Sequence, residues 1–421
     1  MKPFAMTALA ATLAASPAVA QDNSIAALRE QLNQLQARIE QMEKERQAAP
    51  RATAAAPANV VTGGDTPGSF KLPGSDTSVQ ISGYLKLDAI YNRDQDLGDT
   101  LFVEGLSTAG GTQDGKFRLH ARESRLVVKT SAPNGLRTHL EADFFGASGN
   151  EVFSNSDNFR IRHAYGELGG FLAGQTWSNF MHFAAYPATV DFDGPVGVSF
   201  LRQAQLRYTF PVGPGSLSVA AENPEGTGFA GAKDSAPDFT ARYSWNGANS
   251  AIEAATVVRR LAYDSAAGDD ATMGYGLLLA GNIGLGPATK LMGGVVWGDG
   301  IGRYVYAASG ASDGSSGIGA AYIDAAGKLK TIEAYGFNVA ASHEWTKKFS
   351  SSLSYGQVRG DRPANLFPTS TEKLESIHFS HFYQVADPVT LGFEISRAAK
   401  KLQNGDSAHA LRFQASAKYA F

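Results

Sequence analysis

The feature that most constrains this chain is a long series of alternating segments whose connections switch between short and long. Short connections fall at residues 133–135, 169–170, 211–214, 246–247, 284–287, 346–347 and 386–387, and long ones near 93–115, 147–156, 178–199, 223–236, 261–270, 299–331, 360–373 and 399–407. Strict alternation places all long loops at one end, which is typical of a transmembrane barrel with short periplasmic turns and long external loops. A soluble sandwich or propeller has no reason to segregate its loops in this way. The sequence therefore predicts an all-β fold, a 16-stranded antiparallel transmembrane β-barrel with an N-terminal coiled-coil helix.

The segments themselves carry apolar residues at alternate positions and polar residues between them, as strands with one apolar and one polar face do. We expect strands near residues 79–92, 116–130, 134–146, 157–168, 169–177, 200–210, 215–222, 237–245, 249–260, 271–283, 288–298, 332–345, 348–359, 374–385, 388–398 and 408–421. The last of them is expected to pair with 79–92 and close the barrel. Its inward Arg412 and Lys418 then join Lys86 across the seam in a positively charged lumen. Aromatic residues near strand ends, such as Trp177, Trp345 and Tyr419, fit interfacial girdles.

The N-terminal part divides into three further segments. Residues 1–20 have a lysine, an apolar stretch and a small-residue cleavage site, as a secretory signal peptide does. Residues 21–48 are expected to form a periplasmic coiled-coil segment, because apolar residues recur at spacings of three and four. The alternative is a single amphipathic helix packed on its own domain. Residues 49–78 form a linker rich in Pro, Ala and Gly, and residues 79–421 form the porin-like barrel.

The oligomeric state expected from the heptads depends on which rule is applied. Ile at position a with Leu at position d favours two strands. The run at residues 38–43 (RIEQME) instead resembles a trimeric pattern in which an Arg at position g reaches a neighbour's Glu at position e. We therefore expect a homotrimer.

Composition excludes several classes of function. The net charge of −3 gives no overall attraction to nucleic acid, and the chain has no cysteine, so a disulfide framework and a thiolate metal site are excluded. No His-Glu-x-x-His motif occurs, and eight histidines are scattered. We expect no enzyme activity, no catalytic residues, no metal site and no cofactor.

A barrel of this size encloses a water-filled lumen, so its function depends on the residues that line that lumen. Arginines that face lipid would cost roughly 2–4 kcal/mol each near the midplane. We therefore expect Arg160 and Arg162, which share one parity, to point inward. The candidate lumen residues are Arg118, Arg122, Arg125, Arg137, Arg160, Arg162, Arg202 and Arg207. Arg125 lies on the other parity from Arg118 and Arg122. Either a bulge separates them, or one end stands above the membrane.

The third long connection, residues 178–199, is a candidate constriction. If it folds into the barrel, Asp191 and Asp193 would face the arginines, and the transverse field would orient charged solutes. The alternative is an external loop. An arginine wall favours anions, since guanidinium groups stay charged and bind carboxylates bidentately. The arginines could instead pair with lumen acids such as Glu141 for a purely structural purpose.

Several runs resemble the DcaP-like trimeric outer-membrane porins. They are residues 160–166 (RIRHAYG), 172–178 (LAGQTWS), 191–195 (DFDGP), 202–203 (RQ), 83–89 (GYLKLDA) and 141–146 (EADFFG). The resemblance spans the chain, is most specific from 79 to 210 and is looser from 211 to 400.

This resemblance implies a trimeric channel in the outer membrane of a Gram-negative bacterium, with its coiled coil in the periplasm. Its expected solutes are small organic anions, namely dicarboxylates or aromatic carboxylates, taken up passively. The expected partners are outer-membrane lipid and lipopolysaccharide, and through the coil peptidoglycan or a periplasmic protein. The alternatives are a general or sugar-preferring diffusion porin, or an envelope tether.

Overall fold

The computed structural model describes residues 23–48, 60–110, 114–150, 156–224, 231–265, 268–305 and 318–421. The predicted signal peptide and the first part of the predicted linker lie outside these ranges. The chain divides into two units, residues 1–60 and 61–421. In the first unit, helix α1 (Asn23–Ala48) covers the predicted heptads. Its side chains Leu32, Leu35, Ile39 and Met42 are exposed. The helix is thus established, and its coiled-coil pairing stays a prediction. None of the described helices is long and apolar enough to cross a membrane.

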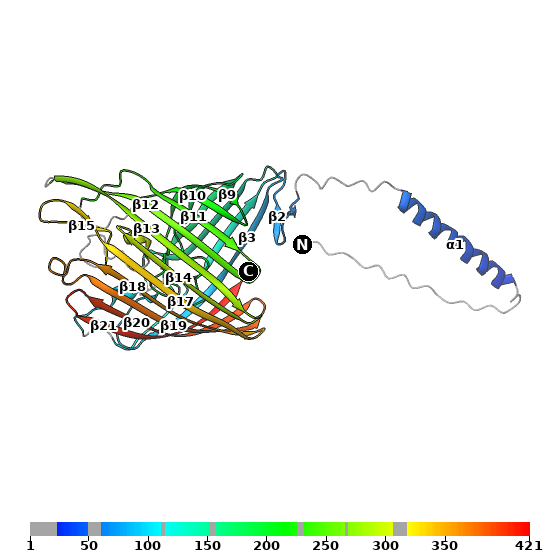
Figure 1. Ribbon diagram of the computed structural model, residues 1–421. Helices are drawn as coiled ribbons and strands as arrows, with labels where there is room; N and C mark the ends of the chain where they lie inside the picture. Colours follow the sequence, from blue (N-terminus) through cyan, green and yellow to red (C-terminus); the bar gives the residue numbers. More distant parts are fainter. Residues whose placement is uncertain are drawn as a thin grey trace. The chain divides into compact units, whose positions relative to one another are not determined.

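The second unit is a closed antiparallel β-barrel, seen from the side in Figure 1. Its wall strands are β3 (Ser78–Asn92), β4 (Lys116–His120), β5 (Arg125–Ser131), β6 (Arg137–Asn150), β7 (Ser156–Leu168), β8 (Phe171–Trp177), β9 (Arg202–Val212), β10 (Gly215–Glu222), β11 (Asp238–Asn246), β12 (Ser250–Ser265), β13 (Gly268–Leu285), β14 (Thr289–Asp299), β17 (Glu333–Thr346), β18 (Phe349–Asp361), β19 (Thr371–Ala386), β20 (Val389–Leu402) and β21 (Ser407–Ala420). Short elements accompany them: β1 (Thr62–Gly63), β2 (Ser69–Lys71), β15 (Ala321–Ile323), β16 (Leu329–Thr331), η1 (Val103–Gly105) and η2 (Gly302–Tyr304).

The predicted closure is confirmed, because β21 pairs with β3 along the seam. Arg412 lies opposite Asn92, and Lys418 lies opposite Lys86. Strands β4 and β5 both pair with β3, one at each end, so they are two halves of one wall strand. Counted in this way, the described part of the barrel has the predicted sixteen strands. The interruption at residues 121–124 includes the stretch between Arg122 and Arg125, where a bulge was one of the two alternatives left open by their parity.

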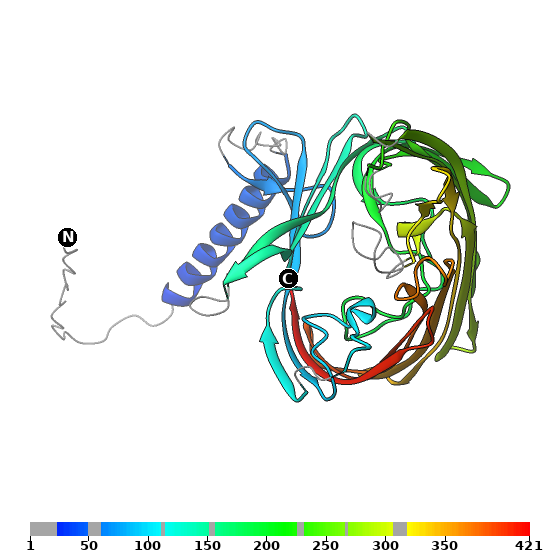
Figure 2. The same cartoon turned by 90° about the vertical axis from the view of Figure 1, so that its left-hand side faces the viewer.

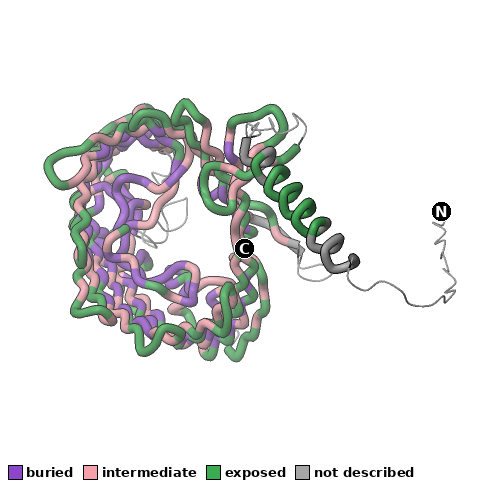
Figure 3. The backbone as a smooth tube through the Cα atoms, turned by 90° about the vertical axis from the view of Figure 1, so that its right-hand side faces the viewer, coloured by how far each residue is buried: buried purple, intermediate pink, exposed green. Residues whose placement is uncertain are grey.

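The two faces of the wall differ in polarity, as a barrel in lipid requires. Apolar side chains such as Leu87, Leu277 and Phe393 are exposed on the outside, whereas polar ones such as Asp88 and Glu394 are buried inside. Figure 3 shows the same division, with buried backbone concentrated inside the ring. The polar lumen is therefore the place to search for a functional site.

Two expectations about connections need correction. The connections expected to be long near 261–270 and 399–407 are mostly strand, because β12 and β13 continue to residues 265 and 268, and β20 and β21 to 402 and 407. Beyond the lipid, a hairpin needs no alternation of polarity, so its strands leave no period-two signal. The segment expected to be an unstructured linker also contains β1 and β2. Strand β2 pairs with residues 78–80 of β3. It lies along the same edge of β3 as β21, which pairs with the later residues of that strand.

Candidate functional site

The third long connection enters the barrel, which is one of the two paths that the sequence left open. We call residues 178–201, between β8 and β9, the constriction loop. Its side chains Phe180, Val190 and Val198 are fully or almost fully buried. Figure 2, viewed from the end with the long loops, shows loop backbone inside the ring of strands. The loop therefore narrows the lumen.

Hydrogen bonds hold the constriction loop against the wall on several sides. Early in the loop, the Ala184 N–H donates to Glu253 of β12 (2.8 Å), and Asn338 of β17 donates to the Ala185 carbonyl (2.7 Å). Later, Gly197 lies so close to the wall that a Cβ there would stand 2.2 Å from the Gln357 carbonyl oxygen. Its φ of 82° also favours glycine. The loop is thus fitted to the wall at backbone level.

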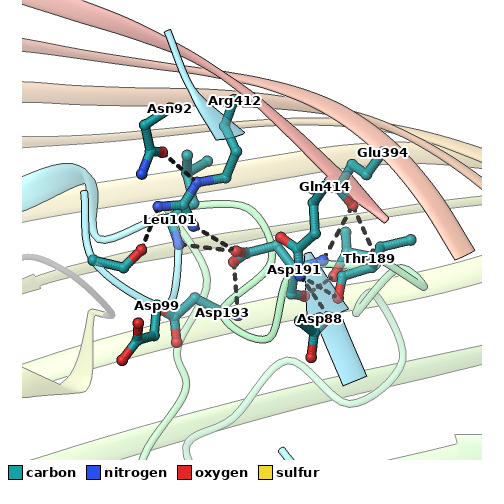
Figure 4. A network of polar contacts seen from close by, with 12 residues as sticks. Asp88, Asn92, Asp99, Leu101, Thr189, Asp191, Asp193, Glu394, Arg412 and Gln414 are labelled. Carbon is teal, nitrogen blue, oxygen red and sulfur yellow. Dashed lines mark hydrogen bonds and ion pairs between the residues drawn. The ribbon is translucent and has the colours of Figure 1, made fainter. Parts of the chain in front are cut away.

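The middle of the loop is fastened to the closing seam (Figure 4). Arg412 of β21 donates from Nη1 to the Asp191 carboxylate (3.1 Å), and both side chains are fully buried. The same carboxylate accepts from the Leu101 N–H of the first long loop (2.9 Å). Glu394 of β20 accepts from the Val190 N–H (2.7 Å). We call Asp191, Arg412 and Glu394 the loop anchor.

This anchor corrects the expected role of Asp191. Its carboxylate pairs with Arg412 instead of facing Arg160 and Arg162. Asp193 is buried beside it, and its N–H donates to the Asp191 carboxylate (3.0 Å). The residue between them, Phe192, faces the arginines: the guanidinium carbons of Arg160 and Arg162 lie 5.5 and 5.3 Å from its ring centre. The sequence carried a weak signal for this orientation of Phe192. If side chains alternate within residues 191–193, Phe192 points away from the direction of the two aspartates.

Four of the predicted arginines come together on the wall strands β5, β7 and β9. We call Arg125, Arg160, Arg162 and Arg202 the arginine cluster. Arg160 makes two hydrogen bonds to Asp143, at 2.9 and 2.8 Å. Arg162 contacts Glu141 (2.7 Å) and Asp143 (3.1 Å), and Arg125 contacts Glu141 (3.2 Å). Two carboxylates thus form ion pairs with three guanidinium groups. Pairing with lumen acids, which was the alternative to a role in binding anions, therefore occurs for these three arginines.

Arg202 is the least compensated member of the arginine cluster. Its guanidinium lies over the rings of Trp177 (4.6 Å) and Phe200 (6.0 Å). Within the described ranges it makes no ion pair, and its buried Nη1 has no hydrogen-bond partner. Trp177 also lies 5.9 Å from Arg162, so it belongs to the lumen and not to a lipid-facing girdle as predicted. A cation over an aromatic face, with a free edge, can bind a carboxylate.

The remaining predicted arginines lie elsewhere. Arg118 and Arg122 bind the first long loop, at Asp96 and Asp99, and Arg122 also contacts Asp157 (2.7 Å). Burial raises the pKa of Asp96, but the hydrogen bonds from Arg118 and the Gly98 N–H, together with the charges of Arg118 and Lys116, outweigh it, and the pKa of Asp96 falls below its ordinary value. These two arginines thus fasten a loop through paired carboxylates.

Arg137 and Arg207 also lie apart from the arginine cluster. The Arg137 side chain is 68% exposed, near Glu167 (4.0 Å), beside a short turn. Arg207 of β9 approaches the side-chain oxygen of Asn179 (3.5 Å). Sequence reasoning also missed Arg242 of β11, whose guanidinium lies 4.6 Å from the Phe183 ring. The sequence signal for Arg242 was its parity, which is that of the inward-facing residues of β11.

Comparison with known proteins identifies the family. A family model described as DcaP outer membrane protein matches residues 9–401. The chain belongs to this family. The crystal structure of the outer membrane channel DcaP of Acinetobacter baumannii superposes with a TM-score of 0.73 at 25% identity, over 84% of this chain and 99% of that one. An anion-selective porin from Comamonas acidovorans shares the fold, with a TM-score of 0.54 at 14% identity, over 82% of this chain and 100% of that one.

A curated relative supports the same class. Porin Omp2b of Brucella suis is 28% identical over 160 residues, which cover 37% of this chain and 40% of the porin. The match thus spans about two fifths of the relative's length. Together these findings make the protein a DcaP-family porin of the Gram-negative outer membrane, a passive channel and not an enzyme.

Proposed function

We propose that this channel prefers small organic anions, with dicarboxylates and aromatic carboxylates as its main solutes. The observation that carries this proposal is the arginine cluster, in which the carboxylates of Glu141 and Asp143 pair with three of the four guanidinium groups and leave Arg202 without an ion pair in the described ranges. The formal excess there is two positive charges. Arg202 beside the Trp177 ring, and Arg160 beside the Phe192 ring, each offer a cation next to an aromatic surface, which suits an aromatic carboxylate.

The size of the effect is sufficient for selectivity. A unit charge about 5 Å from an uncompensated guanidinium gains about 1–3 kcal/mol, for an effective dielectric constant between about 80 and 20. About 1.4 kcal/mol corresponds to a tenfold preference. A dicarboxylate carries two charges and gains more than chloride, whereas a cation is repelled by the same amount.

A general or sugar-preferring porin is the second candidate, and one observation favours it. Arg118 and Arg122, both predicted to act on solutes, are occupied by Asp96, Asp99 and Asp157. If the arginine cluster were neutralised to the same degree, the lumen would lack a net preference. The uncompensated Arg202 is the residue that separates the two candidates.

The test is the reversal potential of the purified channel in a planar bilayer under a gradient of potassium chloride, then of potassium succinate and potassium phthalate. We expect an anion preference that Arg202→Gln lowers several-fold. Arg137→Gln is the matched control, because Arg137 is exposed and lies outside the arginine cluster. A cation preference in the unmodified channel would refute the proposal, and an unchanged ratio in Arg202→Gln would refute the role of that residue.

We also propose that the channel is a homotrimer with the predicted coiled coil in the periplasm. Support comes from the apolar side chains of α1, which are exposed in the single chain. Apolar residues at positions a and d of a heptad are stabilised by packing against another helix. About three heptads are too short to be stable alone, so we expect the barrel to contribute a second interface.

The helix could instead serve as a tether to peptidoglycan or to a periplasmic protein. The two roles are distinguished by deleting residues 21–60 from the mature chain. Dissociation of the oligomer supports the trimer role, whereas an intact oligomer with a weakened envelope supports the tether.

A further inference from the structure

One region of the outer face carries charge where its surroundings are apolar. Below it, toward the short-turn end, the exposed residues of β19 and β20 include Ile377, Phe379, Phe393 and Ile395. Toward the long-loop end of the same strands, the outward positions turn basic. We define the outer basic patch as Arg359 of β18, Lys373 of β19, and Arg397 and Lys401 of β20.

The strand register places three of these cations in one row. Arg359 lies directly opposite Lys373, and Lys373 lies directly opposite Lys401. Like charges directly opposite each other across a sheet are destabilising. Negative charges nearby must therefore compensate the repulsion among these three cations.

The protein itself supplies part of that negative charge through a bulge. The register of β19 shifts between Thr371 and Lys373, which places Glu372 among the cations. Glu372 binds both Arg359 and Lys401, the latter at 2.7 Å. Glu375 binds Lys373 (2.8 Å) and accepts from the Tyr355 hydroxyl (2.7 Å).

The compensation is incomplete. Four cations face two carboxylates within ion-pair distance, which leaves a formal excess of two positive charges. Arg397 is exposed and makes no ion pair with any residue in the described ranges. The Lys401 side chain remains 42% exposed although it is paired. The acids Glu333 and Asp361 lie opposite each other one row further toward the long loops and bound the patch.

The height of the patch fits the headgroup region of the outer leaflet. It adjoins Tyr335, which lies opposite Arg359, and Tyr355, which lies opposite Ile377 in the row of Arg397. Aromatic residues mark the membrane–water interface of outer-membrane barrels, and long loops face outward from the cell. The basic side chains thus begin where the apolar band ends, on the external side.

We propose that the outer basic patch binds the phosphorylated headgroup of an outer-leaflet glycolipid. Phosphate monoesters carry up to two charges and accept hydrogen bonds from guanidinium and ammonium groups. The apolar surface below the patch receives the acyl chains of the same molecule. A second copy of this chain is a poor occupant, because the cores of protein interfaces are depleted of charged residues. The trimer contact therefore lies on another part of the wall.

The test uses the full-length channel, purified in a mild detergent, and native mass spectrometry with added lipid. The probes are diphosphorylated lipid A, lipid A stripped of both phosphates, and inorganic phosphate. The variant is Arg397→Gln with Lys401→Gln. Its matched control is Lys290→Gln with Lys347→Gln, which removes the same charge from exposed positions at the short-turn rim.

We expect the patch variant to bind diphosphorylated lipid A about tenfold or more weakly, since hydrogen bonds to charged groups are lost. The control should bind it as the unmodified channel does. Single-channel conductance should stay unchanged in both, which shows that the barrel is folded. Equal binding of lipid A without phosphates would overturn the proposal, as would equal loss in the control. Binding of inorganic phosphate as tight as that of the lipid would overturn the lipid assignment.

Discussion

The substitution Arg412→Met should release the constriction loop from the wall. Arg412 donates to Asp191 (3.1 Å), to the Asn92 side chain (2.8 Å) and to the Gly98 carbonyl (2.8 Å), and its side chain is fully buried. Removing one partner of a buried pair costs about 3–5 kcal/mol, because the other charge stays buried and uncompensated. With tenfold per 1.4 kcal/mol, the released state of the loop gains about 10²- to 10⁴-fold in population relative to the anchored state. The wall should persist, since the backbone pairing of β21 with β3 and β20 does not depend on this side chain.

The assay is single-channel recording together with limited proteolysis. We expect larger and noisier currents from Arg412→Met, and cleavage within residues 178–201 that the unmodified channel resists. The double variant Asp191→Leu with Arg412→Met removes both charges and should restore quiet currents, since an apolar pair of similar volume is often neutral. Quiet currents and full protease resistance in the single variant would show that the anchor does not hold the loop.

Four further results are expected. Phe192→Leu should lower the preference for phthalate over succinate about 2- to 10-fold, measured as relative current block, because a contact between two aromatic rings is worth about 0.5–1.5 kcal/mol; an unchanged ratio would contradict this. The anion preference should fall between about 0.1 and 1 M salt as the Debye length shrinks from about 10 to 3 Å, and a constant reversal-potential ratio would contradict a charge-based filter. Because the pKa of Asp96 is depressed below 3.8, its bond to Arg118 should hold at pH 4 and fail only as pH falls further; conductance that changes already at pH 5 would contradict this assignment. Leu35→Asp in α1 should lower the temperature at which the oligomer dissociates on a gel, and an unchanged temperature would exclude helix pairing.

The wall of the barrel was largely predictable because parity is a local signal. Alternation within residues 408–421 gave Arg412 an inward position, and the seam with β3 followed from the need to close the sheet. The change of parity between Arg122 and Arg125 made an irregularity there one of two alternatives, and the strand is interrupted at that point. Such inferences depend only on neighbours a few residues apart and on the absence of water in lipid.

The interior was much less predictable, because its contacts join residues far apart in the chain. Asp191 and Arg412 are 221 positions apart, and nothing near either residue specifies the other. The predicted meeting of Asp191 with the arginine cluster was wrong for that reason. Leu101, in a loop expected to be external, is also buried in the lumen. A loop that folds inward buries apolar residues just as a wall strand does, so its composition alone does not reveal its path.

The position of the loop anchor also has a consequence for how the channel is made. Arg412 belongs to the strand that closes the ring, whereas Asp191 belongs to a loop formed by strands much earlier in the chain. Before β21 pairs with β3, the loop lacks this partner and the narrow part of the pore is unfinished. Closure of the wall and completion of the filter are thus one event in assembly. A barrel that stalls before this step has an open side and also a constriction loop that lacks its Arg412 partner.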